Sequence, residues 1–208
     1  MRAHRLNRTH WIGLAILCAA LIAGVVDAPY PQQMLLQHIP TTAALLAWPA
    51  LQNRLRFSDG AASGLALFLL LHILGARYIY SYVPYDDWAR LLTGRTLTDI
   101  FSFQRNHYDR LVHFAFGLFF TRPAFEIFTR RFGLSATLAR YTSIESILAA
   151  SALYELFEWS LTLLLGGEDV EAYNGQQGDL WDAHKDMALA LLGSLCTLPL
   201  LRRGTATA

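Results

Sequence analysis

Acidic and imidazole side chains occur inside apolar stretches of this sequence, at spacings that place them on common helix faces. Asp109 and His113 are four residues apart, and Glu155 and Glu158 are three apart. Residues separated by three or four positions lie on one face of an α-helix. Because ionisable groups are costly in hydrocarbon and are usually functional there, both pairs are candidate site residues.

A third acidic group precedes the last apolar stretch, in residues 178–187. If this segment is helical, Asp179, Asp182 and Asp186 form one acidic stripe, and His184 points away from it. Asp179 and Asp182 also suit a simpler role, since a carboxylate caps a helix start or complements the helix dipole. Asp186 lies deeper and fits that simpler role less well.

These groups together suit two kinds of chemistry. Carboxylates bind Mg²⁺, Ca²⁺ or Mn²⁺ and histidine favours zinc, so the cluster is a candidate divalent-cation site. Neighbouring carboxylates can also relay protons or act as general acids and bases, with His113 and Glu158 as candidate catalytic groups. Arg77 and Arg110 are candidate substrate-binding residues, because a guanidinium can clamp a phosphate or carboxylate. The candidate metal ligands are Asp109, His113, Glu155, Glu158, Asp182 and Asp186.

Purely structural roles are the alternative for the same residues. The two glutamates could form ion pairs with Arg77 or Arg110, and Asp109 could pair with Arg110 or Arg105 at the interface. His113 could serve only to hydrogen-bond a neighbouring helix, as polar groups in helix bundles often do.

The elements that must position these groups are membrane helices. Of the 208 residues, 54% are hydrophobic and only 16% are charged, against about 25% charged residues in soluble proteins. The net charge of +1 provides no basic field that would attract nucleic acid. Cys18 and Cys196 have no CxxC partner, which excludes a disulfide framework and a zinc ribbon. The composition predicts an all-α, polytopic membrane protein with a single integral membrane domain, residues 1–208.

Six apolar stretches are candidates to cross a bilayer, whose hydrocarbon core of about 30 Å needs about 20 residues of helix. Arginines lie before the first stretch, between the second and third, between the fourth and fifth, and after the sixth. Because cytoplasmic loops are enriched in Lys and Arg, we predict six transmembrane helices with both termini in the cytoplasm. We expect the first to be retained rather than cleaved as a signal peptide. The predicted spans are residues 10–27, 33–52, 61–83, 108–128, 143–165 and 183–201.

Two segments between these spans are predicted to lie at the outer surface. Residues 86–107 mix aromatic and apolar side chains with charges, which favours an amphipathic helix that could act as a lid. Residues 168–179 contain acidic residues and glycines, and we expect them to fold back over the mouth of the bundle.

Three motifs carry a resemblance to a known family. Residues 105–114 read RNHYDRLVHF, residues 154–159 read YELFEW, and residues 178–187 read GDLWDAHKDM. In this order they resemble the YjdF-like family of bacterial inner-membrane proteins over nearly the whole chain. The resemblance implies a six-span protein of the bacterial inner membrane and no particular activity. The layout also resembles VanZ-like membrane proteins more distantly, with an acid and a histidine on one span, glutamate on the next and aspartate at the start of the last.

Three functions are compatible with these patterns. The first is an outward-facing pocket that binds a divalent cation and an anionic lipid or cell-envelope molecule. The second is a small proton-coupled transporter, in which the carboxylates bind and release protons. The third is a non-catalytic membrane scaffold whose polar cluster only joins helices.

Overall fold

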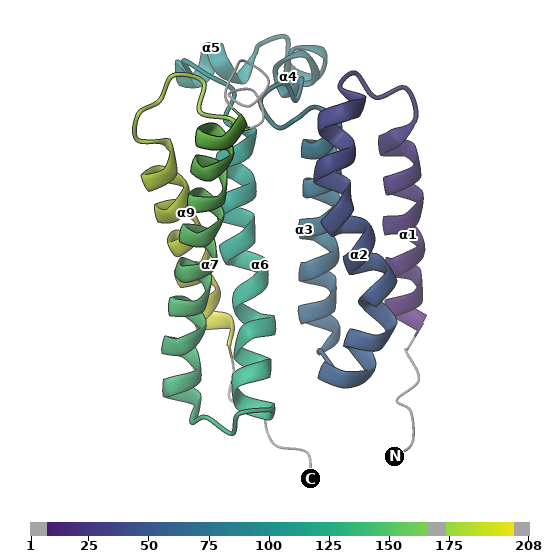
Figure 1. The fold of residues 1–208 in the computed structure, drawn as a ribbon, viewed down its shortest axis with the longest axis vertical. Helices are drawn as coiled ribbons and strands as arrows, with labels where there is room; N and C mark the ends of the chain where they lie inside the picture. Colours follow the sequence, from purple (N-terminus) through teal and green to yellow (C-terminus); the bar gives the residue numbers. More distant parts are fainter. Residues whose placement is uncertain (1–7, 166–173, 202–208) are drawn as a thin grey trace.

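The computed structural model describes residues 8–165 and 174–201, and all regular secondary structure in those ranges is helical. Three long helices pack against one another in the N-terminal part and three more in the C-terminal part, and α3 packs against α6 to join the two groups (Figure 1). Two short helices lie across one end of these groups (Figure 1). The helices are α1 (Arg8–Val25), α2 (Pro31–Leu55), α3 (Asp59–Arg77), α4 (Tyr85–Thr93), α5 (Leu97–Phe101), α6 (Tyr108–Arg130), α7 (Ala136–Leu165) and α9 (Asp182–Thr197).

Four of the described helices, α1, α3, α6 and α7, are long and apolar enough to cross a membrane. The helix α2 is not among them, although it runs unbroken through Pro40 and Pro49. The helix α9 is not among them either, because it has only 16 residues before the chain continues as the short 3₁₀ helix Leu198–Leu200. The all-helical fold is confirmed, while the count of six spans stays a prediction.

Two helices begin or end at residues other than the bounds of the predicted spans. The third span was expected to continue to residue 83, but α3 ends at Arg77 because Ile79 and Tyr80 adopt left-handed backbone conformations, with φ of 43° and 57°. The fifth was expected to begin at residue 143, but α7 begins at Ala136. The hydroxyl of Ser135 accepts a hydrogen bond from the Leu138 amide (3.3 Å), a helix-capping contact that permits this earlier start.

The closest helix packing is that of α6 on α9. Gly117 of α6 faces the backbone of Ala190, and Gly193 of α9 faces the backbone of Phe114, so closely that a Cβ atom at either glycine would clash with main-chain atoms. Small residues allow membrane helices to approach in this way. The hydroxyls of Thr121 and Ser194 are hydrogen-bonded to each other across the same contact (2.7 Å). This seam fixes the register of the two helices that carry Asp109, His113 and Asp186.

The two described arginine-rich loops, which follow α2 and α6, lie together at the end of the molecule opposite α4 and α5 (Figure 1). The Arg130 guanidinium donates to the carbonyl of Arg56 (2.5 Å), and that of Arg131 donates to the carbonyl of Arg54. The loop between α2 and α3 therefore contacts the end of α6.

Candidate functional site

The first two turns of α6 present Asp109 and His113 on one face. The imidazole Nε2 of His113 lies 3.7 Å from a carboxylate oxygen of Asp109. His113 is buried, with 7% of its surface exposed. The i, i+4 spacing read from the sequence is thus realised in the helix.

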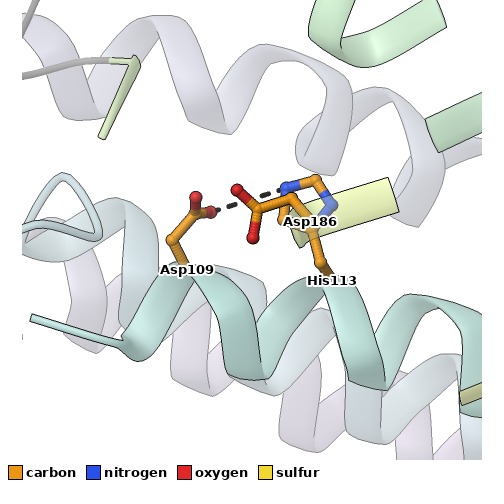
Figure 2. A group of neighbouring side chains, drawn as sticks. All are labelled: Asp109, His113 and Asp186. Carbon is orange, nitrogen blue, oxygen red and sulfur yellow. Dashed lines mark ion pairs between the residues drawn. The ribbon is translucent and has the colours of Figure 1, made fainter. Parts of the chain in front are cut away.

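Asp186 approaches this pair from α9. Figure 2 shows its side chain beside those of Asp109 and His113, which project from α6. One ligand atom from each of the three residues lies within 4.8 Å of the others. Asp186 is 1% exposed, and its Oδ1 atom has no hydrogen-bond partner within the described part of the chain. A buried carboxylate oxygen without a partner is costly, so this oxygen marks where a ligand would be stabilised.

The helix α7 adds two carboxylates to the cluster. Glu155 Oε1 lies 3.5 Å from His113 Nε2 and makes no hydrogen bond among the residues that are described. Glu158 is buried one turn further along α7. Three helices, α6, α7 and α9, therefore direct acidic groups at one place, as the sequence predicted.

A layer of ion pairs lies at the same end of the molecule, beside the start of α9. Asp182 is contacted by Arg105 and by Arg110, the latter at 3.3 Å. Asp179 is contacted by Arg110 and by Lys185, whose Nζ lies 2.6 Å away. Asp182 and Arg110, predicted as a metal ligand and a substrate clamp, are thus already engaged with each other. The simpler role of Asp179, at the start of the helix, also has support, since its carboxylate accepts from the Trp181 amide (3.0 Å).

Electrostatics in this layer favour charged aspartate and neutral histidine. The hydrogen bond from Lys185 and that from the Trp181 amide hold the pKa of Asp179 well below its usual range. Burial, followed by the charges of Arg110 and Arg105, lowers the pKa of His107. A neutral His107 can accept the Arg110 hydrogen bond through Nδ1, at 3.2 Å.

The described end of the loop before α9 covers the cluster. Arg105 donates to the carbonyls of Gly175 (2.5 Å) and Gln176 (2.9 Å), which ties this loop to the start of α6. Gly175 has a φ of 72°, and a Cβ there would lie 3.5 Å from Asp109. Residues 174–179 therefore lie where the sequence predicted a covering turn, whereas 168–173 fall outside the described residues.

Two side chains of α3, the candidate Arg77 and the histidine His72, lie in different surroundings. The Arg77 guanidinium donates to the carbonyls of Gly24 (2.9 Å) and Val26 (2.7 Å) and so holds the end of α1. His72 Nδ1 shares a short hydrogen bond with the Tyr80 hydroxyl, and its Nε2 lies 3.1 Å from the Gln37 carbonyl. The structure brings His72 and Tyr80 to the site and leaves Arg77 apart from it.

A cavity of about 330 Å³ adjoins the cluster between α3, α6 and α7. Asp109 and His113 line it together with His72, Tyr80 and Tyr154. Its remaining lining is mostly apolar and consists of Phe68, Val112, Phe116, Phe120, Ala150 and Ser151.

The apolar part of this cavity was missed by sequence reasoning, which looked only for ionisable groups. Helical spacing contains the signal, since Phe116 and Phe120 follow His113 by three and seven residues on the same face. On α7, Ser151 and Tyr154 precede Glu158 by seven and four. The amphipathic helix predicted at residues 86–107 is present as α4 and α5, but neither contributes a residue to the cavity lining.

Comparison with known proteins identifies the family of this chain. Residues 9–205 match a family described as "Predicted membrane protein (DUF2238)". The chain is 34% identical over 138 residues to the inner membrane protein YjdF of Escherichia coli strain K12, an alignment that covers 66% of this chain and 62% of that relative. No solved structure matches the chain. The resemblance inferred from the three motifs is confirmed, and the chain belongs to the DUF2238 family of membrane proteins.

Proposed function

We propose that Asp109, His113 and Asp186 bind a divalent cation, with Glu155 as a further ligand. The observation that carries the proposal is the approach of one donor atom from each of the three residues to within 4.8 Å of the others. Ligand atoms bound at about 2.1 Å from one ion in tetrahedral geometry are about 3.4 Å apart. Side-chain movements of about 1 Å would therefore form the site.

The donor set supports an ion that accepts both oxygen and nitrogen ligands. Asp186 and Glu155 each have a carboxylate oxygen without a hydrogen-bond partner within the described residues. Carboxylates suit Mg²⁺, Ca²⁺ and Mn²⁺, whereas imidazole suits Zn²⁺ and other transition metals. The mixed set therefore favours Mn²⁺ or Zn²⁺ over Ca²⁺, whose usual ligands are all oxygen.

The bound cation would allow an anionic group to approach a site that is otherwise acidic. Four carboxylates, those of Asp109, Glu155, Glu158 and Asp186, repel a phosphate or carboxylate unless a cation neutralises them. Arg110 lies at the same end of the bundle and could contact such an anion if it exchanged its aspartate partners. Arg77, which holds the end of α1, has no part in the proposed site.

We also propose six membrane crossings with both termini in the cytoplasm. The contacts of Arg130 and Arg131 with the loop between α2 and α3 support this, because they gather the basic loops at one end. Asp109 and His113 lie in the first two turns of α6, which begins at the opposite end, where α4 and α5 lie (Figure 1). The relative is named an inner membrane protein. This orientation in the same membrane would open the pocket outward.

Metal content measured by mass spectrometry on the detergent-purified protein tests the site. We expect a near-stoichiometric divalent metal in the wild type and its loss in Asp186→Asn. Asp99→Asn is the matched control, because Asp99 is an exposed aspartate on α5 away from the cluster. All three proteins are first checked to be monodisperse. Metal-free wild type after purification in metal-replete buffer would overturn the proposal and favour the proton-coupled or scaffold function instead.

A further inference from the structure

The cavity beside the cluster has polar groups at one end and aromatic groups at the other. Along α6, Asp109 and His113 come first, and Phe116 and Phe120 follow deeper in the helix. The helix α3 repeats this order, since Phe68 lies one turn deeper than His72. The rings of Phe68 and Phe120 are 4.9 Å apart and close the deep end.

The stretch of α6 that lines the cavity is about as long as one leaflet of a bilayer is thick. Asp109 and Phe120 are eleven residues apart on α6, which corresponds to about 16 Å at about 1.5 Å per residue. Half of a hydrocarbon core of about 30 Å is about 15 Å. Asp109 is in the first turn of α6, a helix long and apolar enough to cross a membrane. If α6 spans the bilayer, the polar end lies at the interface nearer α4 and α5 and the aromatic end lies near the bilayer centre.

The cavity opens sideways rather than only toward water. Ala150 and Tyr154 line it from α7, yet Ala150 is exposed and Tyr154 is 42% exposed. Both residues lie near the middle of a helix that is long and apolar enough to cross a membrane. At that depth an exposed residue meets lipid, so the opening between α3 and α7 faces acyl chains.

We propose that this cavity binds one hydrocarbon chain of a membrane lipid, which enters from the leaflet nearer α4 and α5 between α3 and α7. The lipid carries a phosphate headgroup, which meets the cation held by Asp109, His113 and Asp186. The binding of the phosphate headgroup, called the headgroup part below, rests on the proposed cation site. The binding of the hydrocarbon chain, called the chain part below, rests on the cavity alone.

Photo-crosslinking tests the chain part. The full-length protein is reconstituted with phosphatidic acid that carries a photoactivatable group on one acyl chain, and crosslinked peptides are mapped by mass spectrometry. We expect crosslinks to the stretch of α6 that contains Phe116 and Phe120. Ala150→Phe fills the mouth of the cavity and should reduce them about tenfold, the loss expected when about two methylenes can no longer be buried. Ala149→Phe is the matched control, because Ala149 is exposed on the same helix but does not line the cavity.

The same samples separate the two parts of the proposal. Equal crosslinking in Ala150→Phe and Ala149→Phe would overturn the chain part. Metal content is measured in both variants, and we expect it to equal that of the wild type.

A second probe with the same acyl chain and a primary amine in place of phosphate tests the headgroup. We expect a chelator to reduce crosslinking of the phosphate probe only. Crosslinking of the phosphate probe that does not depend on the chelator, or preference for the amine probe, would overturn the phosphate assignment. A metal-free wild type that still crosslinks would overturn the cation site and leave the chain part supported.

Discussion

His113 on α6 lies 3.5 Å from the Glu155 carboxylate on α7 and 3.7 Å from the Asp109 carboxylate on its own helix. One imidazole thus lies between two acidic groups that are 46 residues apart in the sequence. Neither distance is a normal hydrogen bond, which requires about 2.7–3.2 Å. The three groups face one another without being fully paired, which leaves ligand atoms for the proposed cation.

Removal of a bound metal should destabilise the protein. A ligand that binds only the folded state adds about 2.7 kcal/mol at about one hundred times its Kd. We expect EDTA to lower the melting temperature of the wild type in detergent and to leave that of Asp186→Asn unchanged. A drop of equal size in both proteins would show that the chelator acts elsewhere.

Adding a methyl group to the α6–α9 seam should disrupt the site. Gly117→Ala places a Cβ against the Ala190 backbone, which cannot move aside without separating the helices. Overpacking of this kind costs about 1–3 kcal/mol. We expect a lower melting temperature together with loss of bound metal. Gly13→Ala is the control, since a Cβ at Gly13 of α1 meets no atom of the described residues within 4 Å. The melting temperature of Gly117→Ala should be clearly lower than that of Gly13→Ala.

Arg105 should hold the loop over the cluster. Its side chain is 6% exposed and that of its partner Asp182 is 5% exposed, so Arg105→Met leaves a buried charge without its main partner. Breaking a buried pair in this way costs about 3–5 kcal/mol. We expect faster amide exchange at residues 175–182 and a lower melting temperature. The double variant Arg105→Met/Asp182→Leu should recover part of the loss, whereas equal or greater loss in the double variant would contradict the pairing. Arg95→Met, at an exposed arginine, should be neutral.

The Asp179 ion pairs should contribute stability that depends on pH. The pKa of Asp179 is lowered in the folded protein from its ordinary value of 3.8, because Lys185 and the Trp181 amide donate to the charged carboxylate. Such a group stabilises the fold above its unfolded pKa, and the contribution disappears as pH falls through the folded pKa. Asp179→Asn should therefore lower the melting temperature at neutral pH, by an amount that shrinks in strong acid. A difference from wild type that stays constant over the acid range would argue against this role.

The sequence was sufficient to predict the polar cluster because helical periodicity is local. Asp109 with His113, and Glu155 with Glu158, were placed by spacing alone, and the structure brings both pairs together with Asp186. Which groups the arginines would contact was not predictable. Arg77 is a residue type that can bind anions, but it contacts the end of α1. Only the packing of α1 on α3 determines that contact. The apolar cavity also escaped prediction, because phenylalanines at helical spacing do not show whether the space between them is filled.

The glycine seam between α6 and α9 also limits how this family can change through evolution. A larger residue at one side of an ordinary helix contact can be tolerated when the facing side chain becomes smaller. Here the facing atoms are backbone, at Ala190 for Gly117 and at Phe114 for Gly193, so no compensating substitution exists. Both positions should remain small in related chains without covarying with any partner, and a relative that has lost these glycines should have lost the Asp109–His113–Asp186 cluster with them.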